Sequence, residues 1–312
     1  MKTLFLRSIS FTLSLILFLG VAHAKDAEPL KIKDSLGEVV INKMPERVAA
    51  LDMNELDFLD KLGVAVAGTA KDYVPHFLSK YRDDPSVADL GFIVKPNIEK
   101  IYALRPDLIL ITSLQAAQYA EMSKIAPVLH YDVDYRDSNA NHIDIVKAHF
   151  LTLARIFDKE DIANKTIEAL DAKLSEVQEA TKDRPERLLI LMHNKGAFSA
   201  FSKRSRYGFV FDAFGAKIAN ENNDTGLHGK QVTSEFIQSV NPDIIFVIDR
   251  TAVMERRSVL NVESMENPLL RETTAWKNKK VFLVDPEAWY VTAASITPLT
   301  IIMDEVINAY KN

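Results

Sequence analysis

The chain has 312 residues, 47% hydrophobic and 26% charged, which is the composition of an ordinary globular protein. Its 38 lysines and arginines against 43 acidic residues give a formal charge of −5, a balance that disfavours nucleic acid as a partner. The chain contains 0 cysteines, which excludes disulfides and thiolate metal sites.

The N-terminus has the three-part pattern of a secretion signal. Lys2 and Arg7 are basic, residues 9–19 are apolar, and Ala22-His23-Ala24 is a small-x-small cleavage site. The apolar run is shorter than the roughly 20 residues that span a bilayer. We therefore expect residues 1–24 to be a cleaved signal peptide. A mature chain without a cysteine to carry a lipid fits the periplasm of a Gram-negative cell.

Short apolar strands alternate with helices after the signal. Residues 25–45 predict a hairpin, and residues 47–51 predict a buried strand. A helix is predicted over residues 55–62, ended by Gly63, and a short strand over residues 64–68. This alternation indicates a parallel α/β construction.

An internal repeat indicates two similar lobes. Residues 98–111 and 234–247 each predict a short helix that stops before Pro-Asp and is followed by a continuous apolar strand. Residues 57–63 and 209–215 form a second pair in the same order. A helix-Pro-Asp-strand unit is common by itself, so the shared order is what favours duplication.

The middle of the chain predicts helices without strands. One amphipathic helix is predicted over residues 141–157 and a longer one over residues 158–182. The apolar positions of the longer helix lie on one face: Ala163, Ile167, Leu170, Leu174 and Val177. We expect two Rossmann-like α/β lobes, residues 25–157 and 184–312, joined by a long helix at 158–183. A ligand cleft would lie between the lobes, with a small hinge motion.

These features together resemble the helical-backbone class of periplasmic binding proteins, which serve importers of siderophores, haem and cobalamin. The resemblance rests on Pro45-Glu46-Arg47-Val48, the two Glu-x6-Pro-Asp units and the mid-chain helix, and it covers nearly the whole mature chain. The C-terminal half is similar to the catecholate-siderophore, enterochelin-type branch. Its matching motifs are Ser205-Arg206-Tyr207-Gly208, Leu227-His228-Gly229-Lys230, Val247-Ile248-Asp249-Arg250 and Asp285-Pro286-Glu287-Ala288-Trp289-Tyr290.

The resemblance implies four ligand-binding residues. Arg206 and Arg250 would contact the anionic chelate, and His228 and Tyr290 would bind its ferric iron directly. Ferric iron prefers oxygen donors and accepts imidazole, while arginine pairs well with anionic oxygens. Three of the four residues also have an ordinary explanation: His228 as a loop histidine, Tyr290 as a packed aromatic that ends a strand, and Arg206 as part of a solvated basic loop.

One position departs from the branch. An arginine often follows the Pro-Asp strand of the N-terminal half, but here the segment is Thr112-Ser113-Leu114-Gln115, with Leu114 at that place. The missing charge disfavours a highly anionic tris-catecholate. It favours a less charged tetradentate or mixed catecholate ligand.

The repeat also carries a pair of acidic residues. Glu99 and Glu235 stand seven residues before Pro106 and Pro242. The resemblance implies that they dock on an inner-membrane ABC permease dimer. A glutamate favoured by the dipole at a helix N-terminus is the alternative explanation.

Other classes of protein are less well supported. The sequence has no G-x-S-x-G, H-E-x-x-H, P-loop or G-x-G-x-x-G motif, so we expect no enzyme and no intrinsic cofactor. Its 7 histidines are scattered, which disfavours a site for bare zinc or manganese. We expect a monomer that binds a ferric siderophore, with haem or cobalamin as the alternative ligand of the same fold.

Overall fold

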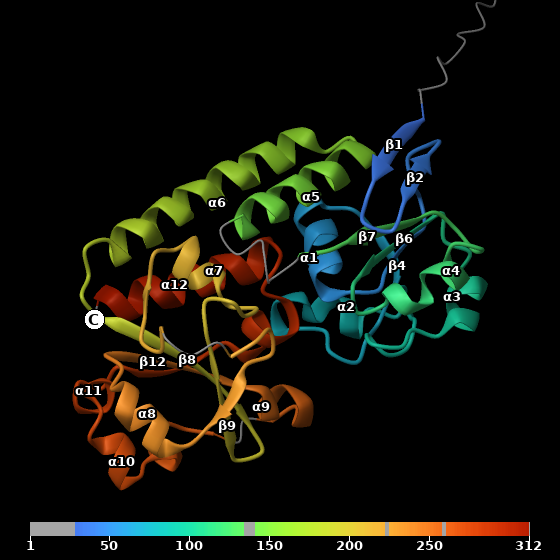
Figure 1. Cartoon of the computed structure of the whole chain (residues 1–312). Helices are drawn as coiled ribbons and strands as arrows, with labels where there is room; N and C mark the ends of the chain where they lie inside the picture. The colour runs from blue at the N-terminus through green and yellow to red at the C-terminus, as the bar shows by residue number, and fades with distance from the viewer. Residues whose placement is uncertain (1–28, 134–140, 222–224, 258–259, 312) are drawn as a thin grey trace, which may run out of the picture.

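The computed structural model describes residues 29–133, 141–221, 225–257 and 260–311. They form two α/β lobes, and the long helix α6 (Glu160–Thr181) runs along one side of both (Figure 1). The predicted signal peptide lies outside the described residues. Within those four ranges, no helix is long and apolar enough to cross a membrane.

The N-terminal lobe opens with an antiparallel hairpin and continues as a five-stranded parallel sheet in the order β5-β4-β3-β6-β7. Its strands are β1 (Leu30–Lys33), β2 (Glu38–Ile41), β3 (Val48–Ala50), β4 (Val66–Thr69), β5 (Ala88–Asp89), β6 (Leu108–Thr112) and β7 (Val128–Tyr131). Its helices are α1 (Met53–Leu62), α2 (Ser79–Asp83), α3 (Ile98–Leu104), α4 (Tyr119–Met122) and α5 (His142–Ile156). The predicted hairpin, strands and helices of this half are confirmed.

The C-terminal lobe has a mixed sheet in the order β11-β9-β8-β12-β13, with β10 on β8. Its strands are β8 (Arg187–Asn194), β9 (Ala197–Phe201), β10 (Lys217–Ile218), β11 (Lys230–Val232), β12 (Ile244–Asp249) and β13 (Val281–Val284). Its helices are α7 (Phe209–Asp212), α8 (Ser234–Val240), α9 (Arg250–Glu255), α10 (Pro268–Arg271), α11 (Thr274–Lys277) and α12 (Ile296–Lys311), with a π-helical segment at Glu287–Thr292.

The C-terminal sheet is mixed because β8 turns back directly into β9. Only Lys195 and Gly196 separate the two strands, and both have positive φ, at 50° and 88°. A two-residue turn of this kind matches the twist of an antiparallel pair. The strand within residues 234–247 was predicted from the sequence, whereas this hairpin was not.

Each lobe has an arginine and an aspartate that are hydrogen-bonded to each other in the same way, at the start of a central strand of its sheet. Asp107 accepts a hydrogen bond from the backbone N–H of Arg47 at 2.8 Å, and Asp243 accepts one from Arg187 at 2.9 Å. Each aspartate returns its own N–H to the carbonyl of the same arginine at 3.0 Å. Both guanidinium groups also donate to carbonyls at the end of the helix before the aspartate. The match supports the internal duplication read from the sequence.

Helix α6 holds the lobes through its apolar face. Ala163, Leu170 and Val177 are buried in a hydrophobic core that takes in residues of both lobes, which confirms the predicted face. Helix α12 packs along α6 and touches α1. The fold class is therefore confirmed: two α/β lobes joined by a long helix.

The segment before α12 belongs to the second lobe by sequence but is bonded to the first. Asn54 Oδ1 accepts from the Ala294 N–H at 3.1 Å, and the Tyr131 hydroxyl donates to the Ala294 carbonyl at 3.0 Å. His142 Nε2 lies 2.9 Å from the carbonyl oxygen of Ala293, where the ring can donate. Asp57 accepts from the Thr297 N–H at 2.9 Å. Buried polar groups of α1 and α5 are thus satisfied by residues 293–297.

Candidate functional site

The carboxyl ends of β8 and β12 fix the position of Arg250. The strands are neighbours, and Arg250 begins α9 directly after β12. Its Nη1 donates to Asn194 Oδ1, at the end of β8, at 2.9 Å. Ligands of open α/β sheets bind beyond such strand ends. Arg250 was predicted from the sequence as a ligand contact, whereas Asn194 was not identified.

A buried histidine supports the turn that carries Arg250. The N–H of Gly196 donates to His193 Nε2 at 2.9 Å, so the ring proton lies on Nδ1 and donates to Asp249 at 2.9 Å. Asp249 also caps α9 by accepting from the Ala252 N–H at 3.2 Å. The backbone leading into Arg250 is therefore held by hydrogen bonds on both sides.

Tyr290 lies against Arg250. Nε of Arg250 donates to the Tyr290 hydroxyl at 2.7 Å, and the guanidinium centre is 5.2 Å from the ring centroid. The sequence analysis placed Tyr290 at the end of a strand, and this was wrong: β13 ends at Val284, and Tyr290 lies on the π-helical segment. The wider π-helical turn is a local irregularity frequently found at functional sites.

Arg206 reaches the same tyrosine from another loop. Its Nη2 donates to the Tyr290 carbonyl at 3.0 Å, and its guanidinium centre is 5.6 Å from the Tyr290 ring. The next residue, Tyr207, is buried and donates its hydroxyl to the Trp289 carbonyl at 3.2 Å. Two cations therefore converge on one phenol ring, an arrangement that favours an anion at this place.

His228 lies on an exposed turn beside this group. The backbone N–H of Arg206 donates to the carbonyl of Leu227 at 3.2 Å, which fixes the turn next to the arginine loop. Gly229 has φ 79°, and a Cβ there would lie 2.9 Å from the Phe201 ring. The structure thus brings Arg206, Arg250 and Tyr290 into contact. His228 is adjacent, without a hydrogen bond to them among the described residues.

Glu305, which was not identified from the sequence, anchors the segment that carries Tyr290. Glu305 accepts from the Trp289 indole N–H at 2.6 Å and from the Asp285 N–H at 2.7 Å. Burial raises the pKa of Glu305 to about 7, although both N–H groups favour its charged form. The indole of Trp289 is fully buried against Tyr207 and Phe246. The sequence signal was a pair of acidic residues, Asp304 and Glu305, within an otherwise apolar helical stretch.

The N-terminal lobe faces Arg206 across the gap between the lobes. Asp52, at the end of β3, is buried, and this burial raises its pKa. The guanidinium of Arg206 acts in the opposite direction on the same carboxyl, so the two groups are close enough to interact. Asp52 also accepts from the Thr112 hydroxyl at 3.1 Å. The loop with Leu114 therefore begins at a residue bonded to Asp52.

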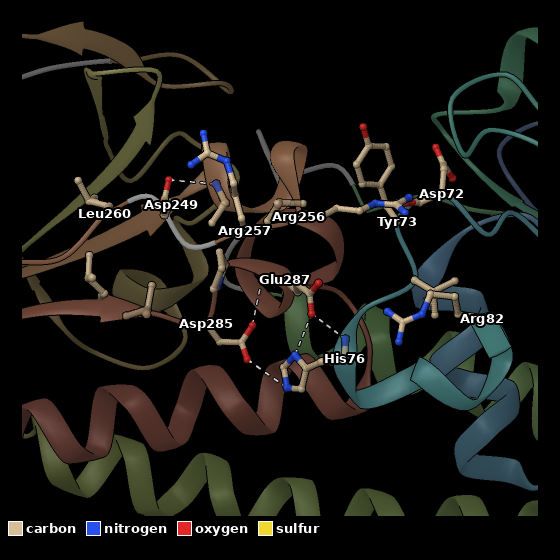
Figure 2. Close-up of a pocket in the computed structure, with 16 residues that line it drawn as sticks. Asp72, Tyr73, His76, Arg82, Asp249, Arg256, Arg257, Leu260, Asp285 and Glu287 are labelled. Carbon is tan, nitrogen blue, oxygen red and sulfur yellow. Dashed lines mark hydrogen bonds and ion pairs between the residues drawn. The ribbon is translucent and has the colours of Figure 1, made fainter.

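An inter-lobe cavity of about 460 Å³ lies beside α9 (Figure 2). His76 of the N-terminal lobe stands between Asp285 and Glu287, with its Nδ1 2.8 Å from Glu287. Arg256 crosses to the Asp72 carbonyl. The cavity lining includes Asp249 but not the four residues predicted to bind ligand, so it is a different part of the cleft.

Glu99 and Glu235 occupy matching places. Each is exposed in the first turn of a seven-residue helix, α3 or α8, that is capped by Asn97 or Thr233. The backbone N–H of Glu235 itself and, after it, the Thr233 side chain lower the pKa of Glu235. Because α3 leads into β6 and α8 into β12, each paired in parallel with a neighbouring strand, both glutamates lie toward the carboxyl ends of those strands.

The described residues contain no group of three or more histidine or acidic side chains that could hold a metal ion. His228 and Tyr290 alone would leave most coordination positions of a ferric ion unfilled. Iron at this site would need most of its donors from a chelator.

The chain belongs to the periplasmic binding protein family, whose model matches residues 48–288. The ferric-anguibactin-binding protein FatB of Vibrio anguillarum is 54% identical over 91% of this chain and 88% of its own length. The petrobactin-binding protein YclQ of Bacillus subtilis is 36% identical, over 89% and 87%. A solved structure of the siderophore-binding protein BauB, bound to ferric iron and two acinetobactin molecules, is 54% identical with a TM-score of 0.87. It covers 91% of this chain and 99% of that one.

Proposed function

We propose that this protein captures a ferric siderophore between its lobes and delivers it to an ABC importer, without catalysing a reaction. The observation that carries the proposal is the convergence of Arg206 and Arg250 on Tyr290 at the carboxyl ends of the C-terminal strands. The ligands named for FatB, YclQ and BauB support the same class of cargo.

The two arginines bind the chelate, and the tyrosine and the histidine coordinate its iron. Arg206 and Arg250 neutralise the anionic chelate and donate hydrogen bonds to its oxygens. In this structure the Tyr290 oxygen accepts a hydrogen bond from Arg250. When that hydrogen bond is broken, the oxygen is free to bind ferric iron. Bound metal favours the deprotonated phenolate. His228, exposed on its turn, offers an imidazole to a remaining coordination position.

Haem and cobalamin are weaker alternatives. The haem-uptake relative IsdE of Staphylococcus aureus is 23% identical, well below FatB at 54% and YclQ at 36%. Paired arginines around a phenol suit a compact oxyanionic chelate better than a flat, largely apolar macrocycle.

Delivery and location complete the proposal. Glu99 and Glu235 present one carboxylate from each lobe to a two-fold permease, and a monomer suffices because one chain supplies both walls of the cleft.

The protein works in the Gram-negative periplasm after cleavage of residues 1–24. Its parts are an N-terminal lobe at 25–157, a linking helix at 158–183 and a C-terminal lobe at 184–312. N-terminal sequencing of the periplasmic protein tests the cleavage.

Ligand capture is tested by titrating the protein with a ferric bis-catecholate. Arg250→Gln should weaken binding by about 30-fold or more, because truncating one partner of a desolvated charge pair costs about 2–5 kcal/mol. Arg155→Gln on the exposed side of α5 is the matched control and should bind normally.

Replacing His228 and Tyr290 together should weaken affinity and alter the charge-transfer absorption. Unchanged affinity and spectrum in that variant would refute their role as iron ligands.

Docking is tested separately by uptake into proteoliposomes that contain the permease. Replacing Glu99 and Glu235 with alanine should reduce uptake while the dissociation constant for the siderophore stays the same. Glu160→Ala, an exposed glutamate at the start of α6, is the control. Normal uptake with the double variant would remove the docking role.

A further inference from the structure

Three exposed apolar side chains gather at the carboxyl edge of the N-terminal sheet. Phe92 is 69% exposed and Val94 64%, both in the loop after β5, and Leu114 is 50% exposed after β6. Scattered apolar residues on a surface need no explanation, whereas a group at a ligand-binding edge does. We call these three residues the apolar edge.

A buried glutamine holds the two loops of the apolar edge together. Gln115 is fully buried, and its Nε2 donates to the Ile93 carbonyl at 2.6 Å and to the Leu51 carbonyl at 3.2 Å. Its Oε1 accepts from the Thr112 N–H at 2.9 Å. Because Ile93 lies between Phe92 and Val94, and Gln115 follows Leu114, these bonds fix the two loops of the apolar edge next to each other.

Contacts across the lobes place the apolar edge on the cleft. The N–H of Ile93 donates to Asp72 Oδ1 at 3.0 Å, and the Asp72 carbonyl accepts from Arg256 at the end of α9. The same helix begins with Arg250. On the other side, the hydroxyl of Thr112 bonds Asp52, which interacts with Arg206. The loop after β5 is thus bonded through Asp72 to α9, the helix that begins with Arg250, and the loop after β6 begins beside a carboxyl whose pKa is raised by burial and lowered by Arg206.

We infer that the apolar edge is the wall of the ligand site opposite Arg206 and Arg250, and that it selects a ferric siderophore of low net charge with an apolar or aromatic portion. This inference rests on the proposed function. The catecholate oxygens face the arginines, and the uncharged portion covers Phe92, Val94 and Leu114. A triply charged chelate would turn anionic oxygens toward three apolar side chains, which offer them neither a charge nor a hydrogen bond, at a cost in desolvation.

The test compares a singly charged ferric bis-catecholate with a triply charged ferric tris-catecholate. Wild type should prefer the bis-catecholate. Leu114→Arg should shift the ratio of the two dissociation constants toward the tris-catecholate by about tenfold, between the effects of exposed and desolvated charge pairs. Met44→Arg is the control, because Met44 is 53% exposed but precedes β3, at the opposite edge of the sheet.

A second comparison separates packing from charge. Two bis-catecholates of equal charge, one with an apolar linker and one with a polyether linker, are titrated against the Phe92→Ser, Val94→Ser double variant. Affinity for the apolar ligand should fall by about tenfold or more, as expected for about 1.4 kcal/mol of lost apolar burial, with little change for the polyether ligand.

The outcomes distinguish the inference from the function on which it rests. Wild type that binds neither catecholate overturns the proposed function, and this inference with it. Wild type that binds catecholates but prefers the tris-catecholate, or an unchanged ratio in Leu114→Arg, overturns the inference alone. Thermal melting of each variant checks folding, which exposed positions should preserve.

Discussion

The carboxyl of Glu305 makes stability depend on pH in a direction that can be worked out. Its pKa is about 7 in the folded protein against an ordinary 4.5, because it is buried beneath the Tyr290 segment. The folded state therefore retains a proton that the unfolded state releases as the pH rises above 4.5. Stability from this group is fully present below pH 4.5 and is lost as the pH rises through 7.

The size of the effect follows from the same two values. The difference between 4.5 and about 7 corresponds to about 3 kcal/mol in the free energy of unfolding, as an upper bound. Urea unfolding followed by circular dichroism between about pH 5 and pH 8 measures it. Asp52, Glu55 and Asp57 are also buried with raised pKa values, so the wild-type slope is a sum. The contribution of Glu305 is the difference between wild type and Glu305→Gln.

The variant should be less stable at low pH and should lose much of the pH slope. Glutamine keeps one acceptor but turns an NH₂ toward one of the two N–H donors, which costs about 1–3 kcal/mol. Asp304→Asn is the control, since that neighbouring carboxylate is 50% exposed and should keep most of the slope. An equal slope in Glu305→Gln and wild type would show that the buried proton lies elsewhere.

Two further predictions concern the frame of the site. Gly229→Ala should disorder the His228 turn and weaken siderophore binding severalfold. The reason is that Gly229 has φ 79° and that a Cβ at this position would meet the Phe201 ring. Normal affinity of the variant by titration would contradict this. Asp107→Asn and Asp243→Asn should each lower the free energy of unfolding by about 1–2 kcal/mol in urea, since each weakens a matching charge-assisted bond to a backbone N–H; strongly unequal losses would argue against equivalence of the lobes.

The fold could be read from the sequence wherever local patterns were strong. The Pro-Asp units, the glycine after α1 and the apolar face of α6 each correspond to an observed element. The β8–β9 hairpin was missed because its turn is Lys195-Gly196, in which lysine adopts the left-handed region without a sequence signature.

The site was harder to predict than the fold because its partners come from distant segments. The four ligand-binding positions came from motif resemblance, and three of them are in contact, while their role as ligands stays a prediction. Three supporting residues were not identified from the sequence: Asn194, Glu305 and Gln115. Their hydrogen-bond partners are distant in the chain, or they lie on a helix whose orientation could not be predicted. Trp289 shows the limit clearly: next to Tyr290 in the chain, it turns its indole into the core.

The bonds between residues 293–297 and the first lobe have a consequence for folding. Asn54 and His142 are buried and receive their partners from the last twenty residues of the chain. A first half made alone would lose these bonds and the stacking of His142 on Phe209, and would expose to water the surface that they cover. We therefore expect the two lobes to unfold together as one cooperative unit, with the native state of the first half completed only when the end of the chain has arrived.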